Sequence, residues 1–175
     1  LIGRVVPVKG ILDFINAINI LRQKTNIPFQ VWIVGGAGED KAYAQSCLDL
    51  CSELRLNDVI KFCGEQNMTE VLLNIDLVIL SSHSEALPMV ILEAMASGIS
   101  VVSTRVGCVV DMLEKELISD AGEPIGAGGL TVPRQNPELL ALAVADLMND
   151  PKRRALYEEN GPKRVRQQYT MEKMR

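Results

Sequence analysis

The chain has 175 residues and a formal net charge of −4, with 47% hydrophobic and 23% charged residues. This length and composition fit one folded domain with a substantial core, and they exclude an intrinsically disordered chain. No apolar run approaches the ~20 residues of a transmembrane helix. No basic cluster is interleaved with aromatic residues, so we expect no nucleic-acid partner.

The first segment, 1–10, begins as the end of a strand and becomes a loop at Pro7. It lacks the layout of a signal peptide and is typical of a chain cut inside a strand. Apolar residues at helical spacing then predict a helix that begins at Ile11. Arg4 and Lys9 therefore lie where a strand passes into a helix. Two such cations would neutralise a diphosphate, and the alternative is that both are ordinary surface cations.

The next strand is predicted over 29–34 and ends in the glycine-rich turn 35–38. This turn fails the dinucleotide-binding pattern, because Lys41 stands where a third Gly or Ala is required when the count starts at Gly36. We expect the turn to let the backbone pass close to a ligand or to an adjoining domain.

A helix over 40–54 and a strand over 58–64 follow, and a brief helix over 69–74 has Asn67 or Thr69 as its N-cap. The four cysteines, at positions 47, 51, 63 and 108, include no C-x-x-C pair, and His83 is the single histidine. This pattern predicts small buried thiols in a reducing compartment and no structural zinc site.

The stretch 76–103 has the order strand, polar loop, helix, glycine, strand, which is one βαβ unit. Pro88 suits the first position of the helix, and Gly98 suits its C-terminal end. Glu85 and Glu93 flank the helix start, where free N–H groups and a partial positive charge favour a phosphate. Carboxylates accept hydrogen bonds from hydroxyls, so the pair would suit a sugar on each side of a pyrophosphate. The alternative is that Glu85 interacts with the helix dipole and Glu93 is merely solvated.

Beyond the central unit, a turn and a short helix are predicted over 104–116, and 119–129 is the longest glycine-rich, weakly structured stretch. Its length suggests a lid or an interdomain contact. An edge strand over 129–133 follows. Helices begin at Pro137 and Pro151 behind the capping residues Asn136 and Asp150, and the second one is expected to break near Gly161-Pro162.

Six strand candidates alternate with helices along the chain. This order predicts an α/β fold with a doubly wound, mostly parallel sheet sandwiched by helices, of the Rossmann-like kind. The candidate ligand residues fall where strands pass into helices, which is where such folds bind ligands.

Four motifs in this order resemble those of the GT-B retaining glycosyltransferases of the GT4 type. They are the Gly-Arg…Pro-x-Lys-Gly motif at 3–10, the Val-x-Phe-x-Gly element within 58–64, the E-x7-E pair Glu85 and Glu93, and the Thr-x-Val-Gly turn at 104–107. One departure is Ala86, where the family usually has Gly. The resemblance runs from Gly3 to about Tyr169. Within this family, the sequence is most similar to the Pel-type exopolysaccharide glycosyltransferases.

The resemblance implies that 1–175 is the nucleotide-sugar (donor) binding domain, the C-terminal half of a GT-B fold, with 151–175 as its C-terminal helices. The acceptor-binding N-terminal domain would be absent from this chain, and the isolated fragment inactive. The implied activity is sugar transfer from a nucleotide sugar, UDP-glucose, to a saccharide or other acceptor in the cytoplasm, without cofactor or metal. The alternatives are a nucleotide-sugar epimerase of the same half-fold and a non-catalytic nucleotide-sugar sensor.

By the same resemblance, Arg4 and Lys9 bind the diphosphate and stabilise its departure, Glu85 holds the transferred sugar and Glu93 the ribose. His83 is expected to be a loop residue. The amides of the loop 65–68 are expected to reach the nucleotide base. The remaining predicted donor-binding residues are Gly3, Gly64, Ala86, Leu87, Pro88, Met89 and Val90.

Overall fold

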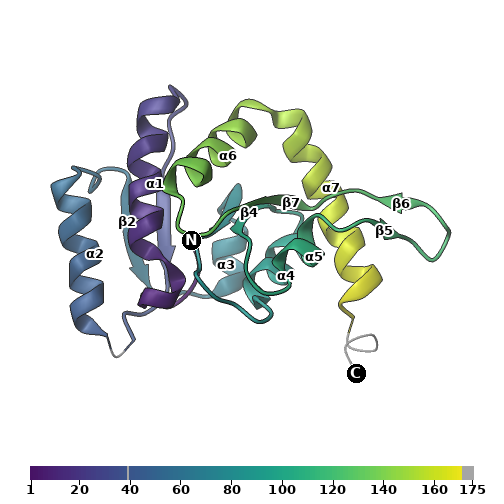
Figure 1. Cartoon of the computed structure of the whole chain (residues 1–175), viewed down its shortest axis with the longest axis horizontal. Helices are drawn as coiled ribbons and strands as arrows, with labels where there is room; N and C mark the ends of the chain where they lie inside the picture. Colours follow the sequence, from purple (N-terminus) through teal and green to yellow (C-terminus); the bar gives the residue numbers. More distant parts are fainter. Residues whose placement is uncertain (39, 171–175) are drawn as a thin grey trace.

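The computed structural model describes residues 1–38 and 40–170, which form an α/β fold (Figure 1). The part of the predicted C-terminal helices that falls on 171–175 lies outside the described residues. In chain order the elements are the 3-10 helix η1 (Pro7–Lys9), α1 (Ile11–Lys24), β1 (Val31–Val34), α2 (Lys41–Glu53), β2 (Ile60–Gly64), α3 (Met68–Leu72), β3 (Leu77–Leu80), α4 (Met89–Ala96), β4 (Ser100–Thr104), α5 (Val109–Leu113), β5 (Leu117–Ile118), β6 (Pro124–Ile125), β7 (Gly129–Val132), α6 (Pro137–Asn149) and α7 (Pro151–Gln168).

The strands form parallel sheets, as predicted, but not one continuous sheet. Strand β1 pairs with β2, and β4 lies between β3 and β7, with every pairing parallel. No pairing between β1 and β3 exists in the described chain. The strand end predicted at the N-terminus contributes only an isolated parallel bridge between Ile2 and Val34. The α/β class is confirmed, and the parallel strands form two sheets, beside which β5 and β6 make a separate antiparallel pair.

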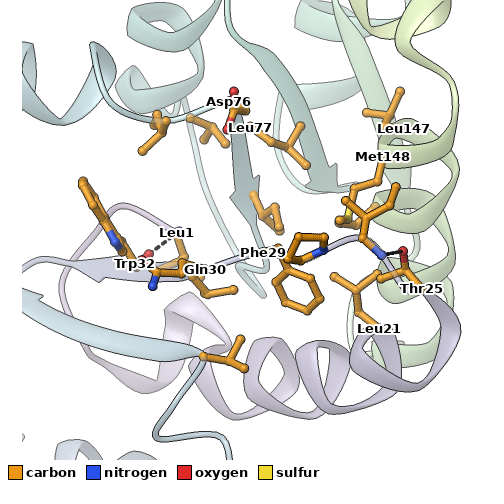
Figure 2. A pocket seen from close by; sticks show the side chains of 18 of the residues that line it. Leu1, Leu21, Thr25, Phe29, Gln30, Trp32, Asp76, Leu77, Leu147 and Met148 are labelled. Carbon is orange, nitrogen blue, oxygen red and sulfur yellow. Dashed lines mark hydrogen bonds between the residues drawn. The ribbon is translucent and has the colours of Figure 1, made fainter.

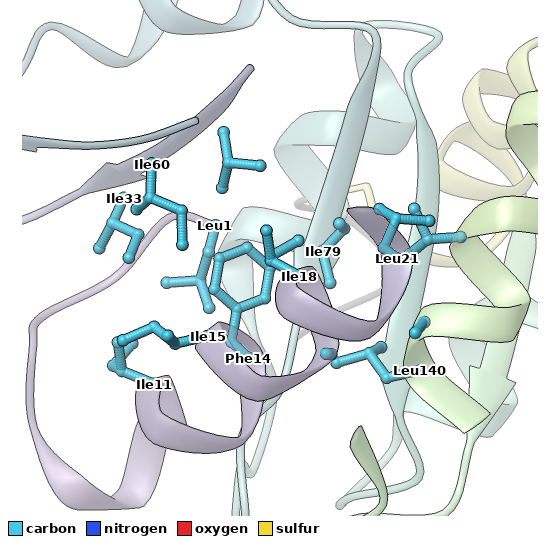
Figure 3. Packing of buried hydrophobic residues seen from close by; sticks show 14 of the residues in the cluster. Leu1, Ile11, Phe14, Ile15, Ile18, Leu21, Ile33, Ile60, Ile79 and Leu140 are labelled. Atoms are coloured by element: carbon cyan, nitrogen blue, oxygen red, sulfur yellow. The ribbon is translucent and has the colours of Figure 1, made fainter. Parts of the chain in front are cut away.

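Helices cover both faces of the strands, because alternate strand side chains enter two different apolar clusters. Ile33 and Ile79 enter the first cluster, which is built around Phe14 of α1 and also contains residues of α2 and α6 (Figure 3). Val34 and Val78 enter the second cluster, to which α3, α4 and α5 contribute. Strands that are apolar on both faces are typical of parallel sheets buried between helices.

The last two helices connect the two sides of the molecule, since α6 packs against α1 and α7 packs against α4 (Figure 1). Their predicted caps are confirmed: the side chain of Asn136 accepts from the Leu139 N–H at 2.9 Å, and that of Asp150 from the Arg153 N–H at 3.0 Å. Across the described residues, none of the helices combines the length and the apolar composition that crossing a membrane requires.

The predicted break of the last helix is wrong. Helix α7 runs without interruption over Pro151–Gln168 and contains Pro162 in its interior. Proline removes one helical hydrogen bond, but tertiary packing holds the helix together at this point. Gly161 lies so close to α4 that a Cβ atom there would be 2.9 Å from the carbonyl oxygen of Met95.

The glycine-rich stretch 119–129 is not wholly a loop, which corrects a second prediction. Strands β5 and β6 pair antiparallel, and the Ser119 N–H donates to the carbonyl oxygen of Glu123 at 2.8 Å inside the hairpin. Each strand has only two residues. A pair this short leaves no alternating hydrophobic pattern in the sequence.

The side chain of Arg164 joins α7 to α5 and the hairpin. It is fully buried. Its Nε donates to Met112 O at 2.7 Å, Nη1 to Gly126 O at 3.0 Å, and Nη2 to Asp111 O and Lys115 O at 3.0 and 2.9 Å. Burial lowers the pKa of the guanidinium from its usual value. The carbonyl groups at the negative end of α5 offset the cost of burying the charge.

Replacing Arg164 by methionine should lower the free energy of unfolding by about 3 kcal/mol or more, because several buried carbonyl groups lose a charged donor at once. Chemical denaturation measures this loss. The matched control is Arg166→Met, at an exposed position of the same helix, which should change stability by less than about 0.5 kcal/mol. Equal effects of the two substitutions would show that Arg164 does not hold these elements together.

Candidate functional site

The predicted site residues come together at the carboxyl ends of the parallel strands. The loop 81–88 follows β3, and the turn 105–108 follows β4. The N-terminal segment crosses the same edge, because the Gly3 N–H donates to Val34 O and the His83 N–H donates to Val8 O, both at 2.8 Å. Segments far apart in the sequence therefore share one edge, the position at which open α/β sheets bind ligands.

Lys9 and Glu85 form an ion pair at the centre of this edge, with Nζ 2.5 Å from Oε1. Their side chains are only 21% and 14% exposed. The Ser82 hydroxyl donates to the same carboxylate oxygen at 2.7 Å. The stem of Lys9 lies over Gly3, where an added Cβ would be 3.3 Å from Lys9 Cε. The structure thus brings Gly3, Lys9 and Glu85 together. Lys9, predicted to bind phosphate, pairs directly with Glu85, predicted to bind the sugar.

Arg4 and Gly64 lie on either side of the glycine-rich turn after β1. Arg4 is exposed, and within the described chain its guanidinium has no ion-pair partner, so it is open to an anion. The carbonyl of Gly64 accepts from the Gly35 N–H at 2.8 Å. Gly64 is exposed with φ of 64°, and a Cβ built there would meet nothing within 4 Å.

Helix α4 begins one residue later than predicted. Pro88 is its N-cap, with φ of −74° and ψ of 103°, and the helix starts at Met89. The fixed φ of proline suits both positions, so the sequence did not separate them. Because the Ile91 N–H donates to Pro88 O at 3.0 Å, the N–H groups of Met89 and Val90 precede the first helical bond and can face a ligand. Leu87 and Met89 are exposed by 39% and 53%.

The turn after β4 supports the loop that carries Glu85. A Cβ on Gly107 would lie 2.1 Å from Glu85 O and 2.8 Å from Ala86 O. The Cys108 thiol also contacts Ala86 O, at 3.0 Å. Ala86 itself is exposed and has no positive φ. The alanine that replaces the usual family glycine therefore causes no backbone strain.

Glu93 lies in the second turn of α4 and is half-buried. In the described part of the chain its carboxylate makes no hydrogen bond or ion pair. It differs in this respect from Glu85, which is already bound by Lys9 and Ser82. The Glu93 carboxylate is thus available to hydroxyl donors of a ligand.

Several residues that position the loop were missed by sequence reasoning. His83 Nε2 lies 2.6 Å from Asp13 Oδ2, and Arg134 Nη1 donates to His83 O at 3.1 Å. The Ser81 hydroxyl donates to Lys9 O at 2.9 Å. No local pattern indicates these long-range contacts. By contrast, the Ser-x-x-Glu spacing that ends at Glu85 matches a capping box and could have indicated the contact with Ser82.

The amides of the loop 65–68 already have partners within the protein. Gln66 Nε2 donates to Cys63 O at 2.6 Å, and Asn67 Oδ1 accepts from the Thr69 N–H at 2.9 Å. Asn67 is thus the N-cap of α3, as predicted. The loop nevertheless borders the same edge, because a Cβ on Gly36 would lie 3.0 Å from Glu65 Oε1.

The family model for glycosyl transferases group 1 matches residues 1–164. The chain belongs to the glycosyl transferases group 1 family. Among its relatives, the D-inositol 3-phosphate glycosyltransferase of Kineococcus radiotolerans is 32% identical over 162 residues, which cover 87% of this chain and 36% of that enzyme. The chain therefore spans little more than a third of this relative's length.

Solved structures show the same fold. The crystal structure of Anabaena HepE in complex with UDP-glucose has a TM-score of 0.82 at 22% identity, covering 95% of this chain and 43% of HepE. The C-terminal domain of the group 1 family protein LpcC from Francisella tularensis has a TM-score of 0.78 at 23% identity, covering 97% of this chain and 85% of that domain. The fold predicted for this chain, one half of a GT-B glycosyltransferase, is that of these neighbours.

Replacing Gly107 by alanine should displace the loop that carries Glu85. The φ of 51° at Gly107 already disfavours a side chain, and the new Cβ would collide with Glu85 O. We expect a stability loss above about 2 kcal/mol and faster hydrogen exchange over residues 81–88, measured by mass spectrometry.

The control is Gly122→Ala, which has φ of 82° but open space around the added Cβ. It should cost only the backbone strain, about 1–2 kcal/mol, and leave exchange over 81–88 unchanged. If the two variants behave alike, the contact between the two loops is not what holds the site.

Proposed function

We propose that this chain is the nucleotide-sugar binding half of a retaining glycosyltransferase of the GT4 type, with UDP-glucose as donor. The observation that carries the proposal is the meeting of Gly3, Lys9 and Glu85 beside the start of α4 at one sheet edge. The fold neighbour HepE was crystallised with UDP-glucose, and the family assignment supports sugar transfer.

The electrostatic task in such a transfer is to stabilise the diphosphate as it leaves. Arg4 is exposed and unpaired among the described residues, and the ammonium of Lys9 has two further hydrogens beyond the one given to Glu85. The first N–H groups of α4 add partial positive charge. Fixed donors of this kind stabilise developing negative charge without reorganising, and in this proposal they do so without a metal.

The two carboxylates would bind different parts of the donor. Glu85 accepts hydrogen bonds from hydroxyls of the transferred sugar, and Glu93 from those of the ribose. Glu85 is held by Lys9 and Ser82, so contacts within the protein fix the position of its carboxylate. Lys9, bonded to Glu85 and adjacent to the phosphate site, then lies between the sugar and the diphosphate.

The acceptor belongs to the whole protein and not to this chain alone. Since the chain spans 36% of a curated relative, we propose that a separate N-terminal domain holds the acceptor. We further propose an exopolysaccharide acceptor and a cytoplasmic location, because the sequences of the motifs resemble those of Pel-type enzymes.

The 175-residue chain should bind UDP and UDP-glucose but transfer no sugar, because the proposed acceptor half is missing. Isothermal titration calorimetry measures binding, and release of UDP measures turnover. EDTA should change the affinity less than tenfold, which corresponds to about 1.4 kcal/mol, because Arg4 and Lys9 supply the positive charge. Turnover by this chain alone would contradict the assignment as a donor half, and a larger EDTA effect would contradict the metal-free site.

Substitutions of the two glutamates should have different effects on the affinities for UDP and UDP-glucose. Glu93→Gln should weaken UDP and UDP-glucose alike, since both carry the ribose. Glu85→Gln should spare UDP and weaken UDP-glucose. A charged hydrogen bond contributes about 1.5–3 kcal/mol, so calorimetry resolves either loss.

Glu53→Gln, at an exposed position at the end of α2, is the matched control and should leave both affinities unchanged. Melting curves first establish that the variants are folded. Wild-type binding of both ligands by both site variants would show that the glutamates are structural and that the donor assignment is wrong.

A further inference from the structure

Besides the Lys9–Glu85 ion pair, a second polar pair joins the same two segments of the chain. His83 Nε2 lies 2.6 Å from Asp13 Oδ2, and the two side chains are 33% and 29% exposed. Lys9 precedes α1, and Asp13 lies in its first turn. His83 and Glu85 both belong to the loop 81–88. The start of α1 and this loop therefore meet at two pairs of side chains.

The first turn of α1 does not use the Asp13 carboxylate as a cap. Gly10 is the N-cap residue, and it has no side chain to offer. The Tyr43 hydroxyl takes this role, because it accepts from the Ile11 N–H at 3.0 Å and from the Leu12 N–H at 3.4 Å. The Asp13 carboxylate is thus available for a contact outside its own helix.

Three different groups of His83 have partners on neighbouring segments. Its N–H donates to Val8 O at 2.8 Å, and its carbonyl accepts from Arg134 Nη1 at 3.1 Å. The third contact is that of the ring with Asp13, and the ring lies so close to α1 that a Cβ on Gly10 would be 3.0 Å from Nε2. A substitution of His83 therefore removes the ring contact and keeps the two backbone contacts.

The ring contact constrains the loop only two residues before Glu85. The ion pair with Lys9 does not fix the position of Glu85 by itself, because a lysine has a flexible four-carbon stem and can follow a displaced carboxylate. Asp13 has a short side chain and His83 has a rigid ring, so a contact between them allows much less displacement. Support of this kind behind a binding residue is what holds a site in its productive geometry.

We propose that Asp13 and His83 are positioning residues for Glu85, which hold the loop so that the Glu85 carboxylate meets hydroxyls of the transferred sugar. The inference rests on the proposed function, in which Glu85 binds the sugar of the donor and Lys9 binds its diphosphate. The pair acts through Glu85. Its loss therefore affects the binding of the sugar and spares that of the diphosphate.

The binding test compares His83→Ala and Asp13→Ala with the unchanged chain by calorimetry. Each substitution should weaken UDP-glucose binding by about fivefold or more and change the affinity for UDP by less than about twofold. The double variant should bind UDP-glucose no more weakly than either single variant, because the two side chains make one contact. His83→Gln, whose amide can still donate to the Asp13 carboxylate, should restore most of the affinity.

Hydrogen exchange tests the positioning role without any ligand. In the His83→Ala variant, the amides of 81–88 should exchange about fivefold faster or more, whereas those of β7 should not change. His83 is the single histidine of the sequence, so one imidazole signal in the NMR spectrum reports on the pair. Asp13→Ala should shift this signal if the contact exists in solution.

The matched control is Asp58→Ala, which removes another ion pair of α1. Arg22 Nη2 lies 2.9 Å from Asp58 Oδ2. This pair lines the cavity of about 800 Å³ along β1 and β3 (Figure 2), at the opposite end of α1 from Asp13. The control should leave both affinities and the exchange over 81–88 unchanged.

Four results would overturn the proposal. They are unchanged UDP-glucose binding by the two single alanine variants, equal weakening of UDP and UDP-glucose, additive losses in the double variant, and unchanged exchange over 81–88 in the His83→Ala variant. A different result concerns the proposed function alone. If the unchanged chain binds no UDP-glucose but His83→Ala still accelerates exchange over 81–88, the donor assignment is wrong and the positioning of the loop is confirmed.

Discussion

The candidate site depends on the close approach of backbone to backbone on both sides of the loop 81–88. On one side, a Cβ at Gly10 would lie 2.2 Å from Ser81 O, and on the other a Cβ at Gly107 would lie 2.1 Å from Glu85 O. Both glycines have positive φ, of 62° and 51°. The loop is thus held between the start of α1 and the turn after β4, at a spacing that only glycine permits.

This close packing explains how a polar loop can present charged groups in fixed positions. The hydroxyls of Ser81 and Ser82, both buried, bond to Lys9 O and to the Glu85 carboxylate. Thr104 donates to Ser82 O at 2.6 Å from the neighbouring strand. The polar groups under the loop are therefore satisfied inside the protein. These hydrogen bonds hold the Lys9–Glu85 pair in one position, as preorganised sites require.

Local sequence signals predicted the parts of the structure that local physics determines. The βαβ unit over 76–103 and the caps at Asn136 and Asp150 were predicted correctly, because strand formation and helix capping depend on residues that are close together in the sequence. The continuity of α7 through Pro162 was missed, because contacts with α4 and α5 override the local cost of proline. The pairing of Lys9 with Glu85 was missed for the same reason, since it joins residues 76 positions apart.

The Lys9–Glu85 pair joins the two sheets, because Lys9 precedes α1 on the β1 side and Glu85 follows β3. The two sheets have no strand pairing with each other in the described chain, and α6 connects them, because it packs against α1 on one side and against β4 and β7 on the other. The distance between ammonium and carboxylate therefore depends on the spacing of the sheets. A substitution that shifts one sheet against the other would therefore change the geometry of this ion pair without touching either of its residues.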